Sequence, residues 1–255
     1  MKVLIWLLGL SLAGQILNLD KERALGAVWA DDIRSKAQAF DLPEVVAYVE
    51  RMGARLAALM PGSDFRFEVV VAEEGAEPVG LPGGIVFVPA AFLAGAEDEA
   101  EVAVMLAHAM GHVSLRHGFA NAGRAKDGQV PLFVMGGWMG AHANARDRAT
   151  FIPSGALGSS KQNELDADRF GVDLAGRAGY DRGALARYIQ RVQPADSGPE
   201  APVPPKRERL AALGGVAGGV VGGSEFLRLR EMVRVKLGWR ERRVGVLVGR
   251  EELVH

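Results

Sequence analysis

The sequence predicts an α+β protein that is mostly helical and carries one small β-sheet. Apolar residues recur at intervals of three and four over most of the chain, which is the period of a helix packed on one face. Only two short runs, residues 65–73 and 84–89, are rich in β-branched residues, so we expect few strands. At 255 residues, 49% of them apolar, the chain is long enough to bury one substantial core.

The first helical pattern covers residues 19–60 and divides into two helices. Asp41 is a plausible N-cap for the second helix, and Pro43 falls in its first turn, where a missing N–H costs nothing. Pro61 and Gly62 then end that helix. These signals predict a helical pair ahead of the first strand.

The two predicted strands are joined through a tight turn. Residues 65–73 alternate and then run β-branched, and residues 84–89 follow the turn sequence Leu-Pro-Gly-Gly at 81–84. The next helix covers residues 97–118. It has acidic residues in its first turn, where they face the positive end of the helix dipole, and Gly118 at its end.

The carboxyl-terminal half alternates helices with glycine- and proline-rich connections. In chain order we expect an apolar packed helix or loop at 130–145, helices at 159–181 and 183–192, a proline-rich connection at 194–209, a flexible glycine-rich linker at 211–224 and a tail of unassigned role at 225–255.

Charge and cysteine content exclude several classes of protein. The chain has 30 basic and 31 acidic residues, which argues against a nucleic-acid partner. It has no cysteine, so disulfides, thiolate zinc sites and a lipid-modified amino-terminal cysteine are excluded.

The amino-terminal residues 1–17 are apolar after a single lysine. The run is shorter than the roughly 20 residues of a membrane-spanning helix, and it resembles the apolar region of a secretory signal. An exported, periplasmic protein is the expectation, with membrane association through this segment as a variant of it. An ordinary buried helix start is the alternative.

Two histidines stand at the spacing of a metal site. His108 and His112 are four residues apart in the helix at 97–118, so both imidazoles lie on one face and can bind one ion at about 2.0–2.1 Å. Glu164 is a candidate third ligand, and Asp168, one turn later, can receive the outer N–H of a ligand histidine. The alternative is a chance pair in an unrelated helical protein, which predicts no stoichiometric zinc.

Several ordered blocks resemble a known family. They are residues 81–88, 99–118, 130–140 and 163–181. Together they are similar to the zinc metalloendopeptidases related to HtpX, the CAAX prenyl proteases and the periplasmic protease-chaperone BepA, and the likeness covers about residues 21–209. The resemblance implies a zincin-like domain at 18–210 that acts on unfolded or misassembled envelope polypeptides.

The resemblance also implies roles for individual residues. His108, His112 and Glu164 would hold one Zn²⁺, and Asp168 would contact a ligand histidine. Of the remaining histidines, His117 is predicted to be structural and His142 to be solvated.

A substrate site is implied beside the predicted turn. Gly83, Gly84, Ile85 and Val86 would form the strand edge along which an extended peptide binds through its main chain. The alternative for this stretch is an ordinary tight turn.

The largest departure from the family pattern is Ala109. The signature H-E-x-x-H places a glutamate there, which takes a proton from the attacking water and passes it to the leaving amine. Such help is worth about 10²–10⁴ in rate. Glu101 shares nearly the same helix face but lies about 10.5 Å along the axis, so no substitute is expected.

Three explanations of Ala109 remain open: a deliberate replacement that stops self-digestion, a natural zinc-binding pseudoprotease, or slow residual hydrolysis. If the base is missing, the protein is either a metalloendopeptidase with abolished or very low activity or a chaperone-like peptide-binding module.

A second departure is Val203. Residues 203–209 resemble the family pattern H-P-x-x-x-x-R, with Arg209 in the arginine place and valine where many members have histidine. A structural or gating role for both positions follows if the match holds. A plain proline-rich linker is the alternative.

Overall fold

The computed structural model describes residues 19–31, 33–35, 40–60, 66–72, 77–118, 129–132, 150–153, 161–193, 203–215 and 218–238. The predicted signal-like segment, His142 and residues 239–255 lie outside these ranges. Among the described residues, no helix combines the length and the apolarity needed to cross a membrane.

The structure confirms the α+β class and the predominance of helices. Beyond helical residues 19–31 and 33–35, the helices are α2 (Pro43–Ala58), α3 (Ala90–Gly95), α4 (Glu99–Ser114), α7 (Lys161–Arg177), α8 (Ala184–Val192), α9 (Lys206–Leu213) and α10 (Ser224–Lys236). The strands are β1 (Glu68–Ala72), β2 (Val79–Gly80), β3 (Ile85–Pro89), β4 (Gln129–Leu132) and β5 (Thr150–Pro153).

The three-stranded sheet has β3 in its centre. Its order is β1-β3-β2. Strand β1 runs parallel to β3 with Val70 opposite Phe87, and β2 runs antiparallel to β3 with Val79 opposite the same Phe87. Strands β4 and β5 form a separate antiparallel pair, so the expected packed helix or loop at 130–145 begins instead with a paired strand.

The first turns of α4 and α2 have the residues that the sequence predicts, but the predicted N-cap of α2 is wrong. Helix α4 begins after Asp98, whose carboxylate accepts the N–H of Glu101 at 2.9 Å, and its first turn is acidic as predicted. Helix α2 has Pro43 in its first turn, as expected. Its N-cap is Leu42 rather than Asp41, because Pro43 itself sets the first helical position.

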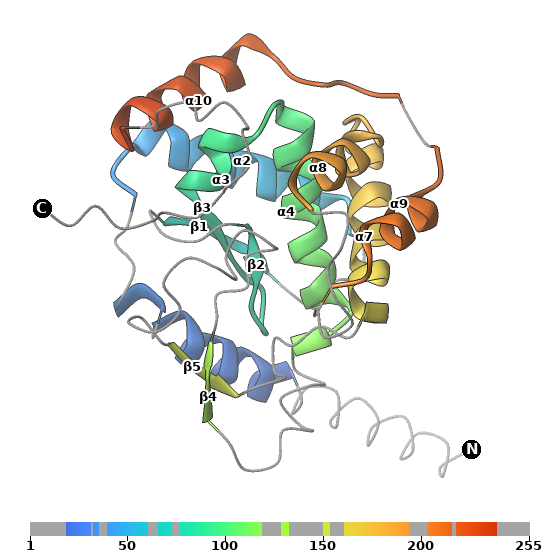
Figure 1. Ribbon diagram of the computed structural model, residues 1–255. Helices are drawn as coiled ribbons and strands as arrows, with labels where there is room; N and C mark the ends of the chain where they lie inside the picture. Colours follow the sequence, from blue (N-terminus) through green and yellow to red (C-terminus); the bar gives the residue numbers. More distant parts are fainter. Residues whose placement is uncertain are drawn as a thin grey trace, which may run out of the picture.

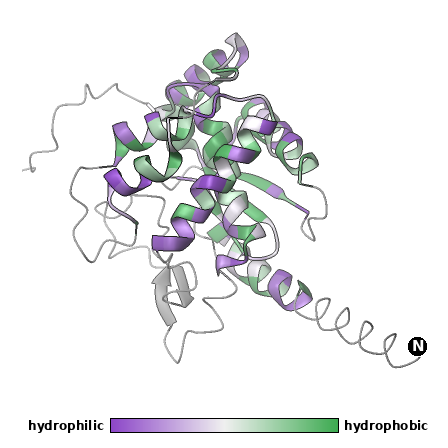
Figure 2. Ribbon diagram, turned by 90° about the vertical axis from the view of Figure 1, so that its right-hand side faces the viewer, coloured by the Kyte–Doolittle hydropathy of each residue, from purple (hydrophilic) through white to green (hydrophobic). Residues whose placement is uncertain are grey.

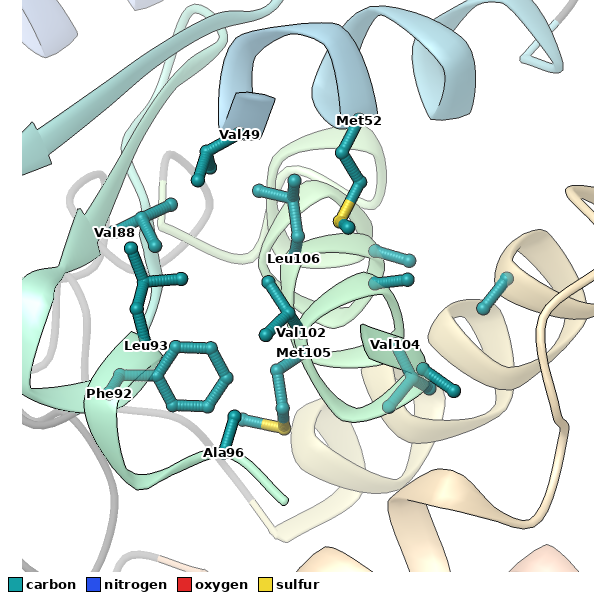
Figure 3. Close-up of a cluster of buried hydrophobic side chains, with 14 of the residues drawn as sticks. Val49, Met52, Val88, Phe92, Leu93, Ala96, Val102, Val104, Met105 and Leu106 are labelled. Carbon is teal, nitrogen blue, oxygen red and sulfur yellow. The ribbon is translucent and has the colours of Figure 1, made fainter. Parts of the chain in front are cut away.

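Helix α4 lies at the centre of the molecule, between the sheet and α2 on one side and α7 and α8 on the other (Figure 1). Figure 3 shows Val49 and Met52 of α2 pointing toward Leu106 of α4, with Val88 of β3 beside them. Leu106 and Val88 are fully buried. This position buries most of the side chains of α4.

Hydrogen bonds hold the described residues 218–220 of the glycine-rich stretch before α10 against the rest of the fold. Val220 N donates to the Gly179 carbonyl at 2.8 Å, and Asp181 N donates to the Val220 carbonyl at 3.0 Å. Gly218 N donates to the Asp181 carboxylate at 2.9 Å. The sequence predicts a flexible linker here, because composition does not record these main-chain partners.

Helix α10 packs onto the main core through Phe226, Leu229 and Val233, all of them buried. Figure 1 places it over α2 and α3, at the far end of the fold from the β4–β5 pair. In Figure 2 the hydrophobic ribbon is concentrated toward the interior, and the hydrophilic turns lie on the outer helices. Residues 225–236 of the predicted tail are therefore part of the same packed body.

Candidate metal centre

The two histidines of α4 converge as their spacing predicts. His108 and His112 lie one helical turn apart, with ring centroids 4.7 Å apart. Their Nε2 atoms are 3.1 Å apart. His108 is 6% exposed. One helix thus presents two imidazole nitrogens to the same point.

Helix α7 brings a carboxylate to that point. Glu164 Oε2 lies 3.6 Å from His108 Nε2, and Glu164 Oε1 lies 3.5 Å from His112 Nε2. One ligand atom from each of the three residues lies within 4.8 Å of the others. Two imidazole nitrogens and one carboxylate are the donor set of a catalytic zinc site with an open fourth position.

The charge states of the two histidines differ. Burial, together with the neighbouring His108, holds the pKa of His112 well below its usual value, so His112 is neutral. Burial also acts to lower the pKa of His108, but Asp168 and Glu164 outweigh it and raise that pKa. A neutral His112 offers an open lone pair, which is the form that binds a metal ion.

Two glycines allow α4 and α7 to cross closely. A Cβ on Gly171 would lie 2.9 Å from the backbone N and 3.0 Å from the Cα of His108. A Cβ on Gly111 would lie 3.0 Å from the ring of Phe170. The close crossing brings Glu164 within reach of both histidines.

A buried ion pair stands behind His108. Asp168 Oδ1 lies 3.0 Å from His108 Nδ1. Arg209 of α9 donates to both oxygens of Asp168, from Nε at 2.8 Å and from Nη2 at 2.7 Å. Burial would raise the pKa of Asp168, but the hydrogen bonds from Arg209 and His108 outweigh it and hold that pKa far below its usual range. An ionised Asp168 at this distance favours the His108 tautomer that carries its proton on Nδ1, while Nε2 faces Glu164.

Arg209 also links the site to the proline-rich segment. Its Nη1 donates to Gln193 Oε1 at 3.2 Å, and Gln193 Nε2 donates to the Pro204 carbonyl at 2.8 Å. The stretch that contains Val203 is therefore tied to Arg209 and, through it, to Asp168. The sequence suggested Arg209 as a structural or gating residue, and the structure places it in contact with Asp168.

His117 lies on the outer side of His112. The Nδ1 atoms of the two rings are 3.1 Å apart, and the ring centroids are 5.1 Å apart. Burial lowers the pKa of His117. This contact places His117 next to the outer nitrogen of His112, and its structural role stays a prediction.

Ala109 is buried beside His108 and supplies no polar side chain. Strand β2 passes over it, since a Cβ on Gly80 would lie 2.2 Å from the Ala109 carbonyl oxygen. Glu101 accepts the N–H of Glu97 at 3.0 Å and pairs with Arg191. These partners hold Glu101 at the start of α4, which agrees with its exclusion as a proton acceptor for the metal centre.

The predicted peptide-binding edge needs correction. Ile85 and Val86 belong to β3, the central strand, and their main chain pairs with β1 on one side and β2 on the other. The Gly84 carbonyl accepts Glu68 N at 3.0 Å. Gly83 and Gly84 do form the turn, with φ of 87° and 109°. Among the described strands the edges of this sheet are β1 and β2, and β2 is the one beside α4.

A second carboxylate near the centre, Glu77, was not predicted from the sequence. The hydroxyl of Tyr188 donates to its Oε1 at 2.6 Å. Burial raises the pKa of Glu77, and the charges of Arg209, His108 and Glu164 also act on it. No spacing rule identifies Glu77, because its hydrogen-bond partner Tyr188 lies on α8, 111 residues away in sequence.

Comparisons with known proteins agree with this geometry. The profile of peptidase family M48 matches residues 43–217. The chain is 28% identical over 193 residues to the beta-barrel assembly-enhancing protease of Yersinia pestis and 26% identical over 196 residues to that of Escherichia coli (strain K12). Each match covers 71% of this chain and 39% of the relative, so the aligned part is about two fifths of those proteins.

Proposed function

The chain belongs to peptidase family M48, whose members are zinc metalloproteases, and on this premise we propose that it is a zinc-dependent metalloendopeptidase of unfolded or misassembled envelope polypeptides. The observation that carries the proposal is the convergence of His108, His112 and Glu164 within 4.8 Å. In this proposal these three residues hold one Zn²⁺.

The residues around the proposed ligands support the same role. Asp168 lies 3.0 Å from His108 Nδ1 and favours a proton there, which leaves Nε2 open to a metal ion, and Arg209 keeps Asp168 ionised. When bound, the ion is a Lewis acid that polarises the scissile carbonyl and acidifies water. Strand β2 offers an edge beside α4 that suits main-chain pairing with an extended substrate, whatever its sequence.

Position 109 limits the rate in this proposal. An alanine cannot accept a proton from the attacking water, and the loss of general base help lowers a rate by about 10²–10⁴. We therefore propose low or abolished hydrolysis by the chain relative to its Ala109→Glu variant.

A peptide-binding module is the second candidate function. It is favoured by one observation: all three donors are in place while the position for the base holds alanine. Such a protein binds zinc and unfolded chains without cutting them. The relatives are named for assembly of beta-barrels, and we propose unfolded envelope proteins as the partners in either case. An exported, periplasmic location fits the apolar residues 1–17.

The test compares casein cleavage by the chain and by its Ala109→Glu variant, each with and without a chelator. Chelator-sensitive cleavage that rises at least about 10²-fold in the glutamate variant supports the metalloendopeptidase. Absence of cleavage by both proteins, with one zinc bound to each, favours the peptide-binding module. Absence of stoichiometric zinc contradicts both functions.

A further inference from the structure

Glu77 is a half-buried carboxylate to which the proposed ligand set gives no role. Its Oε1 accepts the hydroxyl hydrogen of Tyr188 at 2.6 Å. Tyr188 is 7% exposed on α8, and its ring packs edge-on against Phe92 with centroids 5.9 Å apart. A residue of the rigid core therefore holds the carboxylate in place. The hydrogen bond engages one oxygen, and a carboxylate has a second oxygen with its own lone pairs.

Glu77 comes two residues before strand β2, and β2 lies against helix α4 at position 109. It stands three residues before Gly80, whose Cβ position meets the Ala109 carbonyl oxygen. The charges of His108 and Glu164 act on Glu77, and Glu77 in turn acts on Arg209. The Glu77 carboxylate thus interacts electrostatically with His108, Glu164 and Arg209.

The position of Glu77 suits a proton acceptor better than a fourth ligand. Within the described part of the chain, the residues whose ligand atoms all lie within 4.8 Å of one another are His108, His112 and Glu164, without Glu77. Burial also raises the pKa of Glu77 above its usual value, although the hydrogen bond from Tyr188 and the charge of Arg209 partly offset this. A general base works best when its pKa is near the working pH.

We propose that Glu77 is the proton acceptor of the reaction, in place of a side chain at position 109. A Glu77 carboxylate oxygen takes a proton from the attacking water as the water oxygen bonds to the scissile carbonyl carbon. The proton then passes to the amide nitrogen as the C–N bond breaks, and Glu77 returns to the carboxylate. This inference rests on the proposed function, and it assigns the slow hydrolysis of the chain to one residue.

The test is a set of four proteins: the full chain, E77Q, A109E and the double variant E77Q/A109E. Casein cleavage, zinc content, unfolding temperature and casein affinity are measured for each. E231Q is the matched control, because the Glu231 side chain is 66% exposed on α10.

We expect E77Q to lower chelator-sensitive cleavage about 10²-fold or more, with one zinc still bound and casein affinity unchanged. E231Q leaves the rate as it is. In the A109E background, E77Q does not lower the rate, because residue 109 then accepts the proton. In that background E77Q also removes the repulsion between the Glu77 carboxylate and the carboxylate introduced by A109E. A merely structural role for Glu77 would lower the rate in both backgrounds.

Three outcomes overturn the inference and leave the proposed function standing. They are E77Q cleavage equal to that of the parent chain, cleavage by A109E with none by the parent, and loss of zinc from E77Q while the parent binds it. If neither the parent nor A109E cleaves casein, the proposed hydrolase fails and the role of Glu77 fails with it.

Discussion

Replacement of Arg209 by alanine tests the support of the metal centre. In the parent protein Arg209 makes two hydrogen bonds to Asp168, and the two side chains are 10% and 1% exposed. Without Arg209 the buried carboxylate keeps the neighbour His108 at 3.0 Å but loses its two strongest donors. Removal of one partner from a buried ion pair costs about 3–5 kcal/mol, because the other charge is left uncompensated.

That cost is large enough to measure by thermal unfolding. For a protein of this size, 1 kcal/mol shifts the unfolding temperature by roughly 2–4 °C, so we expect Arg209→Ala to lower it by about 6–20 °C in chelator. Zinc affinity should fall as well, by about 10–100-fold, because Asp168 no longer orients His108 as strongly. Circular dichroism melts and zinc titration calorimetry measure the two effects.

Arg207→Ala is the matched control for Arg209→Ala. Arg207 lies on the same helix, α9, and is exposed. Its replacement should change the free energy of unfolding by less than about 0.5 kcal/mol. If Arg209→Ala were no more destabilising than Arg207→Ala, or bound zinc as tightly as the parent, the contact with Asp168 would not support the site and the reasoning would be refuted.

Two further replacements test the helix crossing and the docked glycine-rich segment. Gly171→Ala places a Cβ 2.9 Å from His108 N, so we expect a loss of about 1–3 kcal/mol in unfolding titrations and weaker zinc binding as α7 moves outward. Asp181→Ala removes a carboxylate that accepts Gly218 N at 2.9 Å and pairs with Arg187, so urea titrations at pH 7 should show a less stable protein. Burial would raise the pKa of Asp181, but its hydrogen bonds lower it, so this contribution is complete above the unfolded pKa of about 3.9 and is lost as the pH falls toward the folded value.

Each of these two predictions has its own control. Gly215→Ala should be neutral or nearly so, because no atom of the residues that the structure describes lies within 4 Å of the Cβ position at Gly215. Equal stabilities of the Gly171→Ala and Gly215→Ala proteins would contradict the close-crossing argument. Asp173→Ala is the control for Asp181→Ala, because it removes a carboxylate on α7 that is 61% exposed. A stability gap between Asp181→Ala and the parent that stays constant from pH 7 to pH 3 would contradict the assigned titration.

Local sequence was sufficient for helices α2, α4, α7 and α8, for strands β1 and β3, and for the pair of histidines in the candidate metal centre. The placement of His108 and His112 on one helix face depends only on the helical repeat, and the acidic first turn of α4 depends only on its dipole. The turn at Gly83 and Gly84 depends on positive φ angles that glycine adopts without strain. These are short-range effects, because each is decided within a few residues of the chain.

Tertiary structure alone decided which distant groups meet. Arg209 reaches Asp168 across 41 residues of sequence, and Tyr188 reaches Glu77 across 111. The central place of β3 depends on its pairing with both β1 and β2, which local propensity does not record. A buried charge must find a partner wherever the packed core offers one, and that choice depends on the distance between elements in space rather than on their spacing along the chain. For this reason the sequence predicts the donors His108, His112 and Glu164, whereas Glu77 is evident only in the folded protein.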